Sequence, residues 1–338
     1  MKRLILFFII FHICSIYSSQ IKIEFTNSDK TSTYENIINQ GGKFKNDTIQ
    51  LKKHLAPLLN SSKAIHHGIY FTLLADGYSE FLDKSNLKSE ANYKQALKFA
   101  TKSKDQALTT WVNLSFARYY YKYRNYTELI PYLMEASFVI ESLPKKEIIF
   151  PGKSFQFVGW VLQSIGDEEE STKYLKISNQ HFDNKSSDFA TNLDNIGNNY
   201  LKNGDFKNSE KYYNKAIKLS NEIKDLDRLA RAKGNLGILH FNKGNYNKAE
   251  ELLTEDLALS EKYSTPQNTM FVCISLAKVY LAKGNTNEAI QMISKGENIA
   301  KSKPYFLSSE QEILQLKLKT ISQNTDTNEQ LNIMKRLR

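Results

Sequence analysis

The stretch LDNIGNNYLKNGDFKNSEKYYNKAIKL, residues 193–219, decides the fold. Its pattern returns forty residues later as NLGILHFNKGNYNKAEELL, residues 235–253, and again as SLAKVYLAKGNTNEAIQMI, residues 275–293. Each copy has a small residue, a large residue three places later, a turn motif, and then apolar residues at helical spacing. A fixed period of roughly 20–50 residues indicates a repeat protein, so we predict a chain of stacked units.

One small residue marks each unit, and six units can be followed along the chain. The small residues are Gly77, Ala117, Gly159, Gly197, Gly237 and Ala277. A small side chain lets two helices cross closely, and the larger residue three places later fills the space beside the crossing. Each unit is therefore predicted to be an antiparallel helical hairpin. The predicted fold class is all-α, an α-solenoid or superhelix of stacked hairpins.

A glycine and a capping residue mark the turn inside each hairpin. Glycine supplies the backbone freedom of the turn, and the residue after it accepts a hydrogen bond from the free amides that open a helix. The glycines are Gly166, Gly204, Gly244 and Gly284, and the predicted caps are Ser85, Asn125, Asp167, Asp205, Asn245 and Asn285. These caps predict where each second helix begins.

Prolines test the assignment independently. Pro144, Pro266 and Pro304 fall in the predicted loops between hairpins, as expected of a residue that cannot continue a helix. Pro131 lies inside the predicted second helix of its unit. We therefore expect that helix to start late or to kink.

The pattern of small residue, large residue, turn glycine and alanine with an aromatic on the second helix resembles the tetratricopeptide repeat. The resemblance covers about residues 64–323 and is strongest over 190–296. It implies that the first helices line a concave face that holds an extended or helical peptide. The step of forty residues exceeds the family's usual step of about 34, as in variants that resemble peptide-binding light chains and quorum receptors. The resemblance is to an exported bacterial type.

The sequence divides into four predicted segments. They are a signal peptide (1–19), an N-terminal segment (20–63), the repeat array (64–323) and an incomplete C-terminal helix (324–338). The N-terminal segment holds one amphipathic capping helix, Asp47–Asn60, and carries no clear pattern before it. Near the other end, Ser308–Ser322 is predicted to be a seventh first helix.

The N-terminus has the features of an export signal. Lys2 and Arg3 precede the apolar run Leu4–Ile16, which is shorter than the roughly 20 residues that a spanning helix needs. We expect cleavage between Ser19 and Gln20. An uncleaved anchor helix and a lipidated cysteine at position 14 are the alternatives.

Cleavage would change the charge and the cysteine content of the chain. The formal charge of +10 would become 10 − 2 = +8, because Lys2 and Arg3 would be lost. Cys273 would be the one remaining cysteine, so no internal disulfide can form. The lysines are scattered, which is typical of a solvated helix surface and not of a nucleic-acid site. We expect a periplasmic or secreted protein with no membrane span in the mature chain.

The sequence contains no recognisable catalytic or metal-binding pattern. His66 and His67 are adjacent, so on a helix their side chains diverge by roughly 100° and cannot share one metal comfortably. Cys273 has no histidine near it and is predicted to be a buried small residue. His240 takes the place of a packing aromatic, and the run Glu168–Glu170 fits the positive start of a helix. We therefore predict a non-enzyme without a cofactor or metal.

Residues flanking the small position of each first helix are predicted to face the concave surface. The candidate peptide-binding groove consists of Trp160, Gln163, Asn195, Asn198, Lys202, Arg231, Asn235, Phe241 and Lys278, and Asp194, Ile238, Phe271, Ser275 and Leu281 share that face. Asparagine amides offer both a donor and an acceptor, which suits binding of a peptide backbone. Asn195 and Asn235 hold the same repeat position, forty residues apart. Alternatively, each bonds to neighbours within its own helix turn.

The resemblance also allows a test for one specific ligand, the carboxylate tail of heat-shock chaperones. The clamp for that tail needs cations on the first helices, yet Asp194, Phe271 and Ser275 stand where those cations belong. Asn198 and Asn235 alone match the clamp. Binding of chaperone tails is therefore not expected.

Two hypotheses of function follow. The first is an exported, non-catalytic scaffold that binds a peptide or protein segment on its concave face. The alternative is the periplasmic sensor domain of a truncated bacterial signalling protein, either a histidine kinase or a helix-turn-helix transcriptional regulator. The finish at residues 335–338 agrees with a chain cut before such an output domain. A hydrolase with an unrecognised site is a third class that nothing in the sequence favours.

Overall fold

A computed structural model describes residues 30–80, 85–301, 307–320 and 333–335. Every regular element in these residues is a helix. The chain forms two compact units that meet between Val161 and Leu162. Among the described helices, none combines the length and the apolar character needed to cross a membrane. The predicted all-α class is confirmed.

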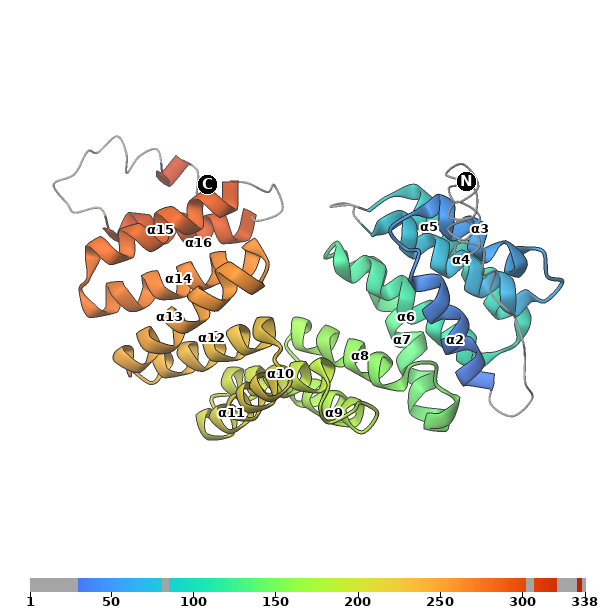
Figure 1. Cartoon of the computed structure of the whole chain (residues 1–338), viewed down its shortest axis with the longest axis horizontal. Coiled ribbons are helices and arrows are strands. Elements are labelled where there is room, and N and C mark those ends of the chain that lie inside the picture. The colour runs from blue at the N-terminus through green and yellow to red at the C-terminus, as the bar shows by residue number, and fades with distance from the viewer. Residues whose placement is uncertain (1–29, 81–84, 302–306, 321–332, 336–338) are drawn as a thin grey trace, which may run out of the picture. The chain divides into compact units, whose positions relative to one another are not determined.

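The described residues of the first unit form seven α-helices, and the last of them runs across the boundary (Figure 1). They are α2 (Lys30–Gly42), α3 (Thr48–Leu59), α4 (Ala64–Ser79), α5 (Leu87–Ser103), α6 (Gln106–Lys122), α7 (Tyr126–Ser142) and α8 (Pro151–Ile165), with the short 3₁₀ turn η1 (Lys145–Glu147) before α8. Apolar side chains of α2 to α6 form one buried cluster. Helices α4 and α5 pack as a hairpin, and so do α6 and α7.

The second unit continues the repeat as successive helical pairs. Its helices are α9 (Glu168–Asn179), α10 (Ser187–Lys202), α11 (Phe206–Glu222), α12 (Leu226–Asn242), α13 (Tyr246–Tyr263), α14 (Pro266–Lys283), α15 (Thr286–Lys301) and α16 (Leu307–Thr320). The pairs α10–α11, α12–α13 and α14–α15 are hairpins, and the first helices α10, α12, α14 and α16 lie next to one another in that order.

Small residues permit close helix crossings where the pattern predicts them in the second unit. A Cβ on Gly197 of α10 would lie 2.7 Å from the Tyr213 ring of α11, and one on Gly237 of α12 would lie 2.8 Å from Leu253 Cγ of α13. Side chains larger than hydrogen would therefore separate these helices. Ala277 of α14 is fully buried.

Gly77 is an exception to this pattern. Its nearest contact is Leu51 of α3, at 2.7 Å from a Cβ built on it, and not the second helix of its own hairpin. The approach of α4 to α5 occurs instead at Gly68, where a Cβ would lie 3.6 Å from the backbone nitrogen of Ala100. The sequence pattern therefore marks a small residue here but assigns it to the wrong contact.

The turns inside the hairpins have the predicted backbone. The four glycines have positive φ angles, which are 89° at Gly166, 76° at Gly204, 77° at Gly244 and 78° at Gly284. Arg124, at the equivalent place in the α6–α7 hairpin, also has a positive φ of 55°. The left-handed conformation is thus a property of the repeat position, and glycine adopts it without steric cost.

Three of the predicted caps accept the expected hydrogen bond with their side chains. Asn125, Asp167 and Asp205 accept from the backbone N–H three residues later, at 3.4, 3.2 and 3.0 Å. Asn245 occupies the cap position of α13 without a side-chain bond, and Asn285 directly precedes α15. The prediction of Ser85 is wrong, because Asn86 caps α5 and accepts from Ser89 N–H at 2.8 Å.

Pro131 does not delay its helix. Helix α7 begins at Tyr126, directly after its cap, and continues through Pro131 to Ser142, so the predicted late start is wrong. Burial of Leu129 and Leu133 on either side of the proline stabilises the helical conformation. Pro144 lies in a connection as predicted, whereas Pro266 is the first residue of α14, where its missing N–H costs nothing. Pro304 lies outside the described residues.

The ends of the chain add one helix that the pattern did not predict. Helix α3 begins after the cap Asp47 and ends before Asn60, as expected. Helix α2 was missed, although Tyr34, Ile37 and Ile38 are buried at helical spacing. Helix α16 corresponds to the predicted seventh first helix. The predicted signal peptide (1–19) and most of 324–338 lie outside the described residues, and only 333–335 is described there, as helix.

Candidate functional site

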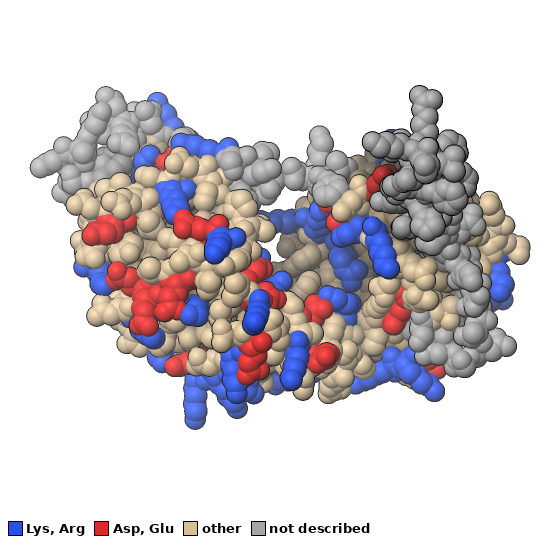
Figure 2. Space-filling model, viewed as in Figure 1, with Lys and Arg blue, Asp and Glu red and all other residues tan. Residues whose placement is uncertain are grey.

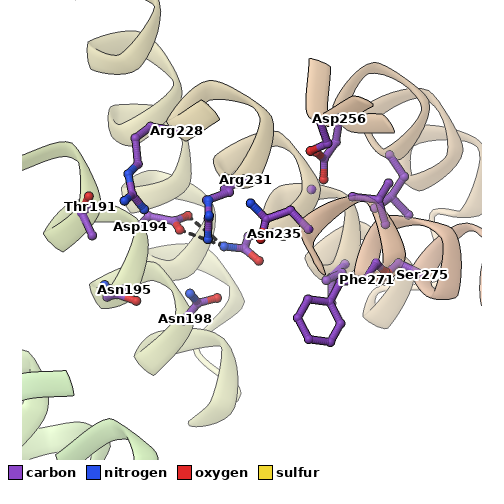
Figure 3. Close-up of a pocket in the computed structure, with 16 residues that line it drawn as sticks. Thr191, Asp194, Asn195, Asn198, Arg228, Arg231, Asn235, Asp256, Phe271 and Ser275 are labelled. Carbon is purple, nitrogen blue, oxygen red and sulfur yellow. Dashed lines mark hydrogen bonds between the residues drawn. The ribbon is translucent and has the colours of Figure 1, made fainter. Parts of the chain in front are cut away.

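A pocket of about 250 Å³ opens on the first helices of three successive repeats in the second unit (Figure 3). Its wall comes from α10, α12 and α14, together with the second helix α13. The lining residues are Thr191, Asp194, Asn195 and Asn198 of α10; Arg228, Arg231, Gly234, Asn235 and Ile238 of α12; Leu253, Asp256 and Ser260 of α13; and Asn268, Phe271, Val272 and Ser275 of α14.

Four of the nine predicted groove residues line this pocket. They are Asn195, Asn198, Arg231 and Asn235. The other five, Trp160, Gln163, Lys202, Phe241 and Lys278, lie outside it. Trp160 lines a different pocket, in the first unit. The structure thus brings together four of the predicted residues, two from α10 and two from α12.

Lys202 connects neighbouring repeats. Its ammonium lies 3.3 Å from Glu168 of α9 and donates to the Gln163 carbonyl oxygen at 3.1 Å. The same pair returns one repeat later as Lys243 with Glu210 at 3.1 Å, and again as Lys283 with Glu250. The recurrence indicates a structural role for Lys202 in joining the end of one first helix to the preceding hairpin.

The remaining predicted residues outside the pocket also contact neighbouring helices. Gln163 donates to the Asn195 carbonyl oxygen at 3.0 Å and to Asn199 Oδ1 at 2.5 Å. Lys278 pairs with Glu312 of α16 at 2.5 Å. The Phe241 ring lies 5.6 Å from that of Tyr246, the first residue of the next helix. These contacts hold the repeats together.

The two asparagines at the same repeat position have different surroundings. Asn235 Nδ2 donates to both carboxylate oxygens of Asp194, at 3.0 and 2.9 Å. Asn195 makes no side-chain hydrogen bond with any residue in the described part of the chain. Asn198 accepts from the Tyr213 hydroxyl at 2.7 Å. Asn195 is thus the amide of this set that retains its full capacity for a ligand.

Asp194 is a carboxylate held within the pocket wall. Burial raises the pKa of Asp194 to about 6. The hydrogen bond from Asn235 and the positive charges of Arg228 and Arg231 act in the opposite direction and lower that pKa. In Figure 3 the Asp194 side chain lies between the two arginines and Asn235. The carboxyl is therefore ionised at neutral pH and fixed in orientation.

Asp256 of α13 was not anticipated from the sequence. Only 3% of its surface is exposed, Ser260 donates to its Oδ1 at 2.7 Å, and burial raises its pKa to about 7. A Cβ on Gly234 would lie 2.0 Å from Asp256 Oδ2, so the glycine makes room for the carboxyl. The sequence signal that could have indicated it is an acidic residue at helical spacing from buried positions of a second helix, which are Leu252, Leu253 and Ser260.

The two arginines of the pocket differ in their hydrogen-bond partners. Arg231 Nε donates to Asp227 Oδ2 at 3.2 Å. The guanidinium of Arg228 makes no hydrogen bond or ion pair within the described ranges, although it lies in the field of Asp194. The pocket thus offers a guanidinium with free donors beside the unpaired amide of Asn195.

The residues considered for chemistry lie in structural settings. Within the described residues, no group of three or more His, Cys, Asp and Glu side chains could hold a metal ion. His66 Nδ1 lies 2.6 Å from Ser61 Oγ, whereas His67 Nε2 faces the carbonyl oxygens of Leu59 and Ser61. Cys273 is buried, and burial raises its thiol pKa to about 11. Its sulfur therefore stays protonated at neutral pH.

Comparison with known proteins gives the same class of repeat. The tetratricopeptide repeat family model matches residues 188–262 and 228–302, which contain α10 to α15. The helices α10 to α15 are therefore similar to tetratricopeptide repeats. No curated protein matches the sequence significantly.

Three solved structures share the fold over most of the chain. A Rap protein complexed with competence and sporulation factor has 12% identity, covering 91% of this chain and 97% of its own, with a TM-score of 0.60. Aspartyl phosphate phosphatase F from Bacillus subtilis has 14% identity, covering 92% and 84%, with a TM-score of 0.58. The apo form of RapI has 16% identity, covering 68% and 81%, with a TM-score of 0.56. At these identities the likeness is one of fold.

Proposed function

We propose that this chain is a non-catalytic tetratricopeptide scaffold that binds a peptide or protein segment across α10, α12 and α14. One observation carries the proposal. The pocket collects unpaired or partly paired polar groups from three successive first helices at one place. A segment lying across these helices would meet Asn195, Arg228 and Phe271 in turn.

The chemistry of the pocket suits a peptide ligand. The Asn195 amide can donate to and accept from a peptide bond, and the Arg228 guanidinium can bind a carbonyl oxygen or a carboxylate. Phe271 is 43% exposed and provides an apolar surface beside them. Exposed aromatic and arginine side chains next to fixed polar groups are typical of protein-binding surfaces.

The fold comparison supports the proposal at the level of architecture. One Rap protein of this fold was solved in complex with competence and sporulation factor. That complex indicates that a protein of this fold can hold a second molecule, and at 12% identity the likeness to this chain is one of fold alone. A phosphatase is also among the fold neighbours, and at 14% identity that likeness to this chain is one of fold alone.

A peptide-array screen with purified protein tests the proposal. The variant carrying Asn195→Ala and Arg228→Gln should lose at least tenfold in affinity for the peptides selected by the unmodified protein. The matched control is Asn221→Ala with Lys218→Gln, two exposed residues of α11 away from the pocket. Equal binding by both double variants would refute a role for this pocket.

We also propose that the chain is exported, on the strength of the apolar run after Lys2 and Arg3. Mass spectrometry of protein recovered from the periplasm and the medium should give a mature N-terminus at Gln20. Recovery of the uncut chain from the cytoplasm alone would refute export.

A further inference from the structure

An apolar stripe lies on the exposed face of α7, the second helix of the α6–α7 hairpin in the first unit. Its residues Ile130, Met134 and Phe138 are 45%, 67% and 78% exposed. They are four residues apart, so they share one face of the helix and form a stripe that is roughly 12 Å long. None of the three lines the proposed peptide site, which belongs to the second unit.

The hairpin does not use this stripe for its own packing. Helix α7 packs on α6, and its buried side chains are Leu129, Leu133, Ala136 and Ile140. These residues form a separate apolar face at helical spacing. Helix α7 therefore carries two apolar faces, of which one is already covered and the other is exposed.

The other second helices do not repeat the stripe. Met134 and Phe138 stand nine and thirteen residues after the cap Asn125. The same places in α9, α11, α13 and α15 are also exposed and hold polar or small side chains, which are Lys176, Gln180, Asn214, Lys218, Thr254, Ala258, Ser294 and Asn298. The repeat itself therefore does not require a large apolar residue at either place.

Glutamates border the stripe on both sides. Glu135 lies three residues before Phe138 and Glu141 three residues after it, so on a helix their side chains flank the ring on opposite sides. Glu128 lies about two turns before Glu135 and continues its row. Glu128 and Glu135 are exposed and make no ion pair with any residue that the structure describes.

This local charge differs from that of the whole chain. Helix α7 contains three glutamates and neither lysine nor arginine. The chain has a formal charge of +10, and Figure 2 shows lysine and arginine side chains spread over the face in view. General electrostatic attraction would therefore repel a basic partner, and only a local acidic surface such as this one would attract it.

The acidic borders restrict what can cover the stripe. A two-fold contact between two copies would place glutamates against glutamates, because both borders are acidic. An anionic membrane attracts basic segments and not acidic ones. An amphipathic helix with lysine or arginine beside its apolar residues fits, since such helices bind through apolar residues spaced three and four apart. Methionine and phenylalanine are also enriched at protein interfaces.

We propose that the exposed face of α7 docks an amphipathic helix of a partner protein whose apolar residues are bordered by lysine or arginine. Ile130, Met134 and Phe138 contact the apolar residues, and Glu128 and Glu135 pair with the cations. This surface is separate from the proposed peptide site, so one chain could connect two different molecules.

A designed peptide serves as the probe. Fluorescence anisotropy follows a fluorescein-labelled peptide that repeats the heptad LKKLLKK, as the unmodified protein is added at low salt. Binding should be saturable, and a peptide that repeats LEELLEE should bind at least about tenfold more weakly. Equal affinities for the two peptides, or no saturable binding of the basic one, would overturn the proposal.

A double variant locates the binding on α7. Met134→Ser with Phe138→Asn introduces the residues that α15 has at the same places, and it should weaken binding of the basic peptide at least about tenfold. The matched control is Ile49→Ser with Leu87→Asn, which removes two other exposed apolar side chains of the first unit and should leave the affinity unchanged. Equal affinities of the two double variants would overturn the proposal.

A second double variant tests the acidic border without changing the apolar stripe. Glu128→Gln with Glu135→Gln should weaken binding of the basic peptide at least about threefold. Unchanged affinity would overturn the proposed pairing with cations. This measurement also decides the matter if the variant of Met134 and Phe138 fails to fold. Arg228→Gln, in the proposed peptide site, should have no effect on this titration.

The variant of Met134 and Phe138 also distinguishes the other occupants. In analytical ultracentrifugation it should have the same mass as the unmodified protein. Both proteins should bind to the same extent to vesicles of phosphatidylcholine and phosphatidylglycerol. A dimer that the variant dissociates would identify a second copy as the occupant, and vesicle binding that the variant loses would identify a membrane; either result would overturn the proposal.

Discussion

Replacing the buried carboxyl of α13 should stabilise the protein at neutral and alkaline pH. Asp256 is 3% exposed and accepts one side-chain hydrogen bond, from Ser260. Asp256→Asn keeps the shape and the acceptor oxygen but removes the ionisable group. The variant should therefore escape the free-energy cost of ionising this position inside the fold.

The size of the effect follows from the pKa of Asp256. Burial raises that pKa from 3.8 to about 7, a difference of about three pKa units at about 1.36 kcal/mol each. The folded state holds the proton more tightly than the unfolded state, so the free energy of unfolding falls as pH rises from about 4 to about 7. The total loss from Asp256 is about 4 kcal/mol, and it is absent below pH 4 and complete above pH 7.

Urea unfolding followed by circular dichroism at pH 4 and pH 8 measures this effect. Asp256→Asn should be close to the unmodified protein at pH 4 and several kcal/mol more stable at pH 8. Glu251→Gln on the same helix is the control, because its exposed pair with Lys248 contributes about 0–1 kcal/mol at most. A gain of equal size at both pH values, or none at pH 8, would show that ionisation of Asp256 is not costly.

Three substitutions separate the forces that form the hairpins, each measured by thermal and urea unfolding. Gly197→Ala places a Cβ 2.7 Å from the Tyr213 ring and should lower the free energy of unfolding by about 1–3 kcal/mol. An unchanged stability would contradict the close crossing of α10 and α11. In Gly244→Ala the new Cβ would meet no atom within 4 Å, but the backbone φ of 77° is unfavourable for alanine. The free energy of unfolding should therefore fall by about 1–2 kcal/mol. A larger fall would indicate a steric contact in addition to the backbone effect. Asp205→Ala removes the acceptor of the Asn208 N–H and should lower the free energy of unfolding by about 0.5–2 kcal/mol at neutral pH. The hydrogen bonds from Asn208 lower the pKa of Asp205, so the stability difference between the variant and the unmodified protein should become smaller in acid.

The fold was predictable where its causes are local. Positive φ at the turn glycines follows from the backbone geometry of one position, and the sequence shows that position directly. The cap of α5 depends on a distant contact, since the Asn86 N–H donates to the Tyr119 hydroxyl at 2.8 Å. No reading of residues 85–90 alone could choose between two adjacent capping residues. Pro131 is tolerated for a similar reason, because buried leucines on both sides outweigh one missing hydrogen bond.

The pocket was predictable only in part, even on the first helices, because Arg228 of α12 was not among the predicted residues. Asn195 and Asn235 both line the pocket, but their partners differ because Asp194 occupies only one of the two neighbouring places. Lys202 was assigned to the groove because its partner Glu168 lies far away in sequence. Comparing equivalent lysines across repeats would have revealed the pairing. Asp256 was missed because second helices were treated as packing elements only.

Helices in the second unit contact their near neighbours in the chain, and this determines how the unit unfolds under mechanical force. In the described residues, the apolar clusters connect α13 with α14, and α14 with α15 and α16, without one centre common to all. A protein built in this way has no single unfolding event. When it is pulled from its two ends in an optical trap, the unit should extend in several steps, and each step should release about one hairpin.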